Sequence, residues 1–290
     1  MLAYNFEFKA MTTACQITLY ETSASKANCI AQKIFDQTKA IEKKYNFHNE
    51  QSWLNTLINQ RKKQSIKLDS QTAKILEKVH RLSGQVNGVF DITLGTYVYA
   101  AKQFQSLSKQ QLKEKYQKVI GLENWNIQNN FIHFKHKDTK IDLGGVMKEV
   151  AVDMASELAL NASGASLINF GGDMKINGRK PNGECFKVGI KNPLNTKQIL
   201  LSLEVENLAL TTSGHYARIQ KLAGNEHSHI LSSTLSNEKH EVLSSTLLAE
   251  DTLTAGLYST SLLLDKHVQC PDNVKYLLID NQKVMHRFGL

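Results

Sequence analysis

The stretch Ile141-Asp-Leu-Gly-Gly-Val-Met-Lys-Glu-Val-Ala-Val-Asp153 carries the strongest pattern in this sequence. It predicts a strand that ends in an acidic residue, then a tight glycine turn and an amphipathic helix. A second segment, Leu167-Ile-Asn-Phe-Gly-Gly-Asp173, predicts another strand that ends in a Gly-Gly-Asp turn. Adjacent glycines let the backbone approach a bulky ligand, and a helix that starts beyond them directs free N–H groups at anions.

These two turns allow two interpretations. Each of them is compatible with an ordinary α/β turn that is capped by an Asp. A carboxylate beside such a turn can instead contact a base, a ribose or a metal. Two turns of this kind about 30 residues apart, each with an Asp, favour a nucleotide site.

The composition is that of a soluble globular protein. The chain has 290 residues, of which 41% are hydrophobic and 21% are charged. We expect a single domain over residues 1–290, which could consist of two intimately packed subdomains. The formal net charge is +8, but the basic residues are scattered and no basic motif is interleaved with aromatic residues. We therefore expect no nucleic-acid partner, whereas an anionic ligand or an acidic partner fits the charge.

The cysteines and the N-terminal segment bear on the compartment. Cys15, Cys29, Cys185 and Cys270 are widely spaced, without a CxxC pair, which argues against a zinc site and against a disulfide framework. The first residues alternate as in a strand, and no run approaches the roughly 20 apolar residues of a membrane span. These features predict a cytoplasmic protein with reduced thiols and no membrane span.

Periodicity along the chain predicts a mixed α/β protein without a domain boundary. We expect helices at residues 24–45, 70–84, 107–118 and 249–264, the third of them capped by Ser108. We expect strands at residues 3–9, 14–20, 165–170, 186–191, 200–204, 208–212, 228–231 and 275–280.

Further segments combine residues that can do chemistry. Gly88-Val-Phe-Asp-Ile-Thr-Leu-Gly95 places an aromatic ring, a carboxylate and a hydroxyl in a short bend, where Asp91 could equally cap the next turn. Thr212-Ser-Gly-His-Tyr-Ala-Arg218 is by itself a polar hairpin as readily as a site. A helix is predicted after Glu250. Within it, Asp251 and Thr254 lie one turn apart, so their oxygens could face one Mg²⁺. Such residues are also common in first helical turns without any metal.

His227 and His229 alternate along a predicted strand and therefore lie on one face. They could form part of a zinc site, but no third ligand stands at a suitable spacing. A general base and a surface histidine are the two other interpretations.

The order of these motifs resembles that of the ApbE family, the FAD:protein FMN transferases. The resemblance runs from about Met11 to about Val284, through the segments listed here in chain order: Met11-Thr-Thr13, Gly88–Gly95, Asp142–Lys148, Asn169–Asp173, Gly189-Ile-Lys-Asn-Pro193, Thr212–Arg218, His229-Ile-Leu231 and the helix after Asp251. It implies a mixed α/β, T-fold-like architecture with FAD in a central cleft and Mg²⁺ at the pyrophosphate.

The implied activity is transfer of FMN from FAD to a Thr or Ser hydroxyl of a target flavoprotein or flavinylated domain, which releases AMP. The residues that match FAD contacts of the family are Met11, Tyr45, Val89, Phe90, Asp91, Asp142, Lys148 and Leu231. Gly145 stands where the family supplies a metal ligand, and Asp251 matches its metal-binding carboxylate. Thr254 could add an oxygen ligand, and His229 is the implied base for the incoming hydroxyl.

The sequence departs from the family pattern at several of these places. Where members typically continue with Asp-Pro-x-Thr-Gly, this chain has Ser232-Ser-Thr-Leu-Ser236. Ala255 replaces a usual Thr, Thr12 a usual Gly, and Met147 and Glu149 a common Ala and Gly. Two alternatives therefore remain beside the transferase: an FAD-binding protein with weakened or lost transfer, and an FAD pyrophosphatase-like hydrolase that yields FMN and AMP.

Overall fold

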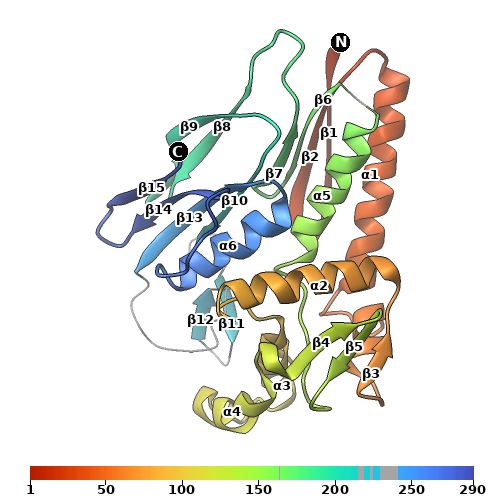
Figure 1. Cartoon of the computed structure of the whole chain (residues 1–290), viewed down its shortest axis with the longest axis vertical. Helices are drawn as coiled ribbons and strands as arrows, with labels where there is room; N and C mark the ends of the chain where they lie inside the picture. Colours follow the sequence, from red (N-terminus) through yellow and green to blue (C-terminus); the bar gives the residue numbers. More distant parts are fainter. Residues whose placement is uncertain (163, 215–218, 223–224, 229–240) are drawn as a thin grey trace.

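A computed structural model describes residues 1–162, 164–214, 219–222, 225–228 and 241–290. It shows a mixed α/β fold around an eight-stranded antiparallel sheet, in the order β1-β2-β6-β7-β10-β13-β14-β15 (Figure 1). The strands of this sheet are β1 (Leu2–Ala10), β2 (Thr13–Glu21), β6 (Ala165–Phe170), β7 (Asp173–Asn177), β10 (Ala209–Gly214), β13 (Val242–Ala249), β14 (Lys275–Asp280) and β15 (Met285–Phe288).

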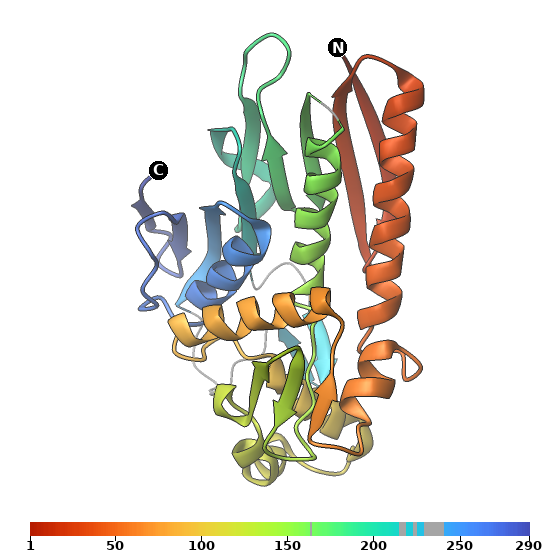
Figure 2. The same cartoon turned by 45° about the vertical axis from the view of Figure 1, so that its right-hand side comes forward.

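One face of the sheet is covered by α1 (Ala24–Tyr45), α5 (Met147–Leu160) and α6 (Thr252–Leu264) (Figures 1 and 2). The helix α1 buries Ala27, Ile30, Ile34 and Ile41 at helical spacing, which gives it an apolar stripe toward α5 and the strands β1 and β2. The helix α6 is apolar on nearly all sides because it lies between the strands β10 and β13, α5 and α2.

A second layer lies at one end of this assembly. The helix α2 (Ser70–Gln85) crosses below α6, and beneath it lies a three-stranded sheet of β3 (Ser65–Lys67), β5 (Phe131–Phe134) and β4 (Trp125–Gln128) (Figure 2). The remaining elements of this layer are η1 (Leu54–Asn59), η2 (Ile92–Leu94), α3 (Gly95–Gln103), α4 (Lys109–Tyr116), η3 (Gln117–Val119) and η4 (Leu122–Asn124).

Two hairpins stand apart from the large sheet. The strands β8 (Phe186–Asn192) and β9 (Asn195–Val205) pair with each other, and Phe186, Val188 and Val205 form an apolar cluster with residues of the large sheet. The strands β11 (Ile219–Leu222) and β12 (Asn225–Ser228) form the other hairpin.

The mixed α/β class and most of the expected elements are confirmed. The helices at 24–45 and 70–84 and the strand at 275–280 match α1, α2 and β14 almost residue for residue. The helix expected at 107–118 is shorter, but Ser108 and Gln111 do form its capping box. Of the strand expected at 228–231, only Ser228 lies among the described residues, at the end of β12.

The strand expected to end at Asp142 is wrong. Residues 140–143 pair with no strand in the part of the chain that the structure describes, because a side chain takes the place of a neighbouring strand. The Asn59 amide accepts a bond from the Ile141 N–H (2.9 Å) and donates one to the Ile141 carbonyl (3.0 Å). The Asp142 N–H bonds the Ile92 carbonyl at 2.9 Å. Buried backbone groups need partners, and here an amide side chain supplies them.

No helix among the described residues is long and apolar enough to cross a lipid bilayer.

Candidate functional site

The site is built where two β-turns meet the start of α5. The β1–β2 turn passes through Met11 and Thr12, both at positive φ (48° and 61°). It lies against the β6–β7 turn, since the Gly171 N–H bonds the Ala14 carbonyl at 3.0 Å. A Cβ at Gly171 would collide with the Thr13 hydroxyl, so the close approach of the two turns requires glycine there.

Lys148, in the first turn of α5, joins these turns. Its ammonium group forms an ion pair with Asp173, the residue after the second Gly-Gly pair, and lies 3.4 Å from Glu149 Oε1. The two segments that carry the sequence pattern are thus in direct contact. Met11 lies at the edge of the same group of turns, where its N–H donates to Glu42 Oε1 at 2.5 Å.

Phe90, Asp91 and Asp142 meet on the other side of the start of α5. The Phe90 ring lies 3.6 Å from where a Cβ of Gly145 would stand. The Asp142 N–H bond to Ile92 joins its turn to the segment after Asp91. The structure therefore brings these predicted FAD contacts together with Gly145.

Both carboxylates in this region are held by their own turns. Asp91 Oδ1 accepts bonds from the Thr93 N–H (2.8 Å) and hydroxyl (2.6 Å), as in the capping interpretation. Asp142 Oδ1 accepts a bond from the Gly144 N–H at 2.9 Å. Burial raises the pKa of each above its ordinary value, and these hydrogen bonds oppose the rise.

Asp251 is the N-cap of α6. Its carboxylate accepts bonds from the Thr254 N–H (2.8 Å) and hydroxyl (2.9 Å), and it forms an ion pair with Lys78 of α2 at 2.7 Å. Burial alone would raise the pKa of Asp251, but these partners outweigh it and hold the pKa below its usual range. The carboxylate is therefore ionised near neutral pH, as a metal ligand must be.

Asp153 is a residue of this site that sequence reasoning missed. From the middle of α5 it accepts the Thr252 N–H (2.7 Å) and the Leu253 N–H (3.1 Å), so α5 is fixed to the start of α6. A carboxylate within the apolar run Val150-Ala-Val-Asp153 was the signal that could have pointed to it.

Because of the pKa of Asp153, we expect the free energy of unfolding to depend on pH. Burial raises this pKa to about 6, against 3.8 for an exposed Asp, with Asp251 adding to the rise. The folded state then binds more protons than the unfolded state between these values, so the contribution of Asp153 to stability falls as the pH rises through this window. From pH 5 to pH 7.5 the loss is on the order of 1 kcal/mol. Urea unfolding should show this loss in the wild-type chain relative to Asp153→Asn; parallel pH profiles would contradict it.

Tyr45 lies apart from these contacts. Its ring packs edge-on against Trp53, with centroids 5.8 Å apart, and its hydroxyl bonds the Thr72 hydroxyl at 2.6 Å. The side chain is buried, so these partners account for its position. Within the part of the chain that the structure describes, no hydrogen bond or ring contact joins Tyr45 to another predicted site residue.

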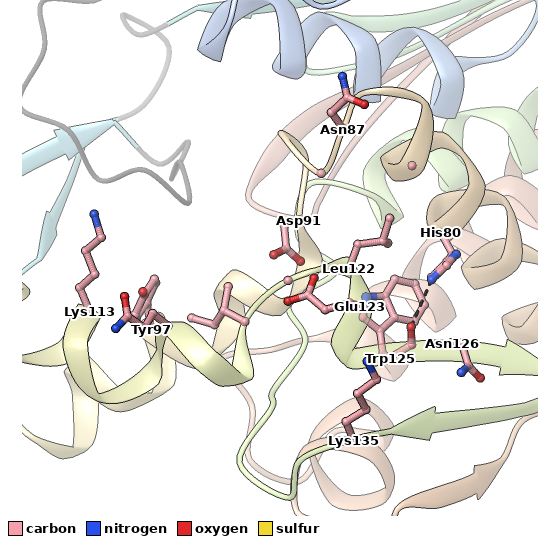
Figure 3. A pocket seen from close by; sticks show the side chains of 15 residues that line it. His80, Asn87, Asp91, Tyr97, Lys113, Leu122, Glu123, Trp125, Asn126 and Lys135 are labelled. Atoms are coloured by element: carbon pink, nitrogen blue, oxygen red, sulfur yellow. Dashed lines mark hydrogen bonds between the residues drawn. The ribbon is translucent and has the colours of Figure 1, made fainter.

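An open groove of about 820 Å³ lies beside the Asp91 turn (Figure 3). It runs between α2, the Asn87–Asp91 turn and the segment from α4 to β4, and Figure 3 shows the Asp91 and Glu123 carboxylates close together on its wall. Of the predicted site residues, only Asp91 lines it. Other residues that line the groove include His80, Tyr97, Lys113, Trp125 and Lys135.

The residues expected to hold Mg²⁺ offer hard oxygen atoms, which that ion prefers. Asp251 and Thr254 stand in the first turn of α6, and Gly145 lies in the turn immediately before α5, which begins at Met147. The buried Glu149 Oε2 has no hydrogen-bond partner among the described residues. Within the same residues, no group of three or more His, Cys, Asp or Glu could hold a metal alone. A cation here would thus need carbonyl, hydroxyl and substrate oxygens as well.

His229 and Leu231, the predicted base and one predicted FAD contact, lie outside the described residues.

The arrangement of sheet, helices and turns is that of known ApbE structures. The ApbE protein from Thermotoga maritima superimposes with a TM-score of 0.87 at 23% identity, covering 99% of this chain and 97% of that one. The flavin transferase ApbE from Vibrio cholerae gives a TM-score of 0.84 at 18% identity, covering 99% and 96%. These likenesses confirm the predicted mixed α/β, ApbE-like fold.

The sequence comparison identifies the family. The model of the ApbE family matches residues 11–276, and the chain belongs to that family. A relative from Chlamydia pneumoniae, named FAD:protein FMN transferase, is 26% identical over 233 residues, which is 78% of this chain and 72% of the relative.

Proposed function

We propose that this chain transfers FMN from FAD to a Thr or Ser hydroxyl of a target flavoprotein, with release of AMP. The proposal is supported by membership of the ApbE family and by relatives named FAD:protein FMN transferase. Two observations carry it: the ion pair of Lys148 with Asp173 joins the two glycine turns, and α5 contacts the start of α6, where the ionised Asp251 stands.

The proposed reaction is a substitution at the phosphorus atom of the FMN half of FAD. The hydroxyl oxygen of the target forms a new bond to this phosphorus, the bond to the bridging oxygen breaks, and AMP leaves with that oxygen. The proton of the hydroxyl passes to His229, the proposed base. Mg²⁺, when bound, would neutralise charge on the pyrophosphate and on the leaving AMP.

The chain's own residues would position FAD. Lys148 brings an ammonium group to the edge of the two glycine turns, where its partners are the carboxylates of Asp173 and Glu149, and it would contact FAD from there. Phe90 offers an aromatic face beside Gly145, and Asp142 a hydrogen-bond acceptor. We propose Met11, Tyr45, Val89, Asp91 and Leu231 as further FAD contacts, and Gly145, Asp251 and Thr254 as ligands of Mg²⁺.

We also propose a single domain and a cytoplasmic location. One core cluster contains residues from Ala10 to Leu278, so both ends of the chain share the same core.

A direct assay tests the function. The chain is incubated with FAD and a target domain, with Mg²⁺ or with EDTA, while AMP release and the mass of the target are followed. A target mass that rises by one FMN, with equal AMP release and only with Mg²⁺, is the expected result. AMP without a change in target mass would instead support hydrolysis. Bound FAD without either product would support a binding protein.

The base assignment has its own test. His229→Ala should lower the rate of FMN transfer about a hundredfold, the lower range for loss of a general base, while FAD binding is retained. Rates at several pH values and FAD affinity check this. The matched variant is His267→Ala, which changes an exposed histidine after α6; equal rates for the two variants would remove His229 from the mechanism.

A further inference from the structure

Glu149 is a buried carboxylate that the described residues satisfy only in part. It lies in the first turn of α5 and is 7% exposed. Its Oε1 is 3.4 Å from the Lys148 ammonium, whereas Oε2 has no hydrogen-bond partner among the described residues. Lys148 also pairs with Asp173, so one lysine serves two carboxylates. The unbalanced negative charge is costly in a buried place unless a cation lies nearby.

The position of Glu149 is set by α6. A Cβ on Gly256 would lie 2.6 Å from Glu149 Cγ and 3.3 Å from Oε1, so the side chain runs directly over this glycine. Asp153, one helical turn further along α5, binds the N–H groups of Thr252 and Leu253. Glu149 therefore contacts α6 at Gly256, five residues after Asp251, which is roughly 7.5 Å along the helix axis.

The start of α6 calls for another oxygen ligand if it is to hold a divalent cation. Asp251 and Thr254 can supply a carboxylate and a hydroxyl, but Ala255 has no side-chain donor. Mg²⁺ is usually held in proteins through one or two carboxylates together with other oxygen atoms.

We propose that Glu149 supplies a carboxylate ligand to the divalent cation held at Asp251 and Thr254. This inference rests on the metal site of the proposed function and adds a ligand of this chain's own to it. The presence of the cation would also account for the unpartnered buried oxygen. Two carboxylates and one hydroxyl, together with the Gly145 carbonyl, would then hold the cation.

Binding of Mn²⁺ to the full chain tests the proposal without any turnover. Free Mn²⁺ is measured by electron paramagnetic resonance, in the absence of FAD and with Mg²⁺ as competitor. Glu149→Gln, which keeps the size of the side chain and removes its charge, should raise the Kd for Mn²⁺ at least about tenfold. The matched control is Glu157→Gln, an exposed glutamate on the same helix, which should bind as the wild-type chain does.

A second variant covers the case in which Glu149→Gln does not fold. Gly256→Ala keeps the carboxylate but places a methyl group 2.6 Å from Glu149 Cγ, so it should displace the ligand and weaken Mn²⁺ binding too. Thermal unfolding without metal identifies folded variants. A folded Glu149→Gln or Gly256→Ala chain that binds Mn²⁺ within twofold of the wild-type chain would overturn the inference.

The two proposals fail separately. Mn²⁺ binding that depends on Glu149, in a chain that transfers no FMN, would refute the transferase and leave the ligand standing. Mg²⁺-dependent FMN transfer, in a chain whose Mn²⁺ affinity is unchanged by Glu149→Gln, would support the transferase and refute Glu149 as a ligand.

Discussion

Asp251→Asn is expected to lower Mg²⁺-dependent FMN transfer at least about a thousandfold, equivalent to about 4 kcal/mol of transition-state stabilisation. Asp251 is the one carboxylate that the family resemblance assigns to the metal, and Lys78 and Thr254 keep it ionised. Asn is as good an N-cap as Asp, so the start of α6 should be preserved. Steady-state AMP release and the mass of the target measure the effect.

A control at the other end of the same helix separates this effect from a general one. Asp265 is the C-cap of α6 and bonds the His267 N–H at 2.9 Å. Asp265→Asn should transfer FMN at close to the wild-type rate. Asp251→Asn with more than a tenth of the wild-type activity, at saturating FAD, would exclude Asp251 from the metal site.

Gly95→Ala is expected to destabilise the protein by about 3 kcal/mol, as overpacking of a well-packed interior does. A Cβ on Gly95 would stand 2.6 Å from the Asp142 nitrogen and 2.8 Å from the Ile141 carbonyl carbon. These are backbone atoms, which cannot rotate away as a flexible side chain can. The Asp142 turn would have to move, so weaker FAD binding should accompany the loss of stability. Urea unfolding and FAD titration check the two effects.

Gly84 provides the matched comparison within a helix. A Cβ there would meet only Leu122 Cδ2, at 3.7 Å, which is an ordinary contact distance. Because Ala favours helix by up to about 1 kcal/mol over Gly, Gly84→Ala should leave stability unchanged or raise it. Equal unfolding midpoints for the two variants would show that the chain around Asp142 yields easily.

Residue patterns within short segments predicted those helices and strands that are determined by their own sequence. The apolar stripe of α1, the capping box at Ser108 and the strand β14 are all found where the residues indicate. The strand β13 was missed because it is buried on both sides along most of its length and lacks alternation. The false strand before Asp142 has a different cause, since its hydrogen-bond partner is a side chain 82 positions away.

The candidate site, too, has parts that the local sequence predicts and parts that it does not. The order of short motifs was enough to indicate the family, and the contact between Lys148 and Asp173 joins two of them. The bonds from Thr252 and Leu253 to Asp153 span about a hundred positions, and the ion pair of Lys78 with Asp251 spans still more. Nothing in the local sequence predicts such pairings, because they depend on how α2, α5 and α6 pack.

The start of α6 has a consequence for how an anion can be recognised. The N–H groups of Thr252 and Leu253 are taken by Asp153, that of Thr254 by the Asp251 side chain, and that of Ala255 by the Asp251 carbonyl. Helices that bind phosphate leave these groups open. This helix end instead presents two carboxylates, with Lys78 paired to Asp251 and Lys175 near both, and these four N–H groups are not open to a pyrophosphate. In the proposed reaction a pyrophosphate at this end would therefore be held through the cation and not by the backbone of the helix.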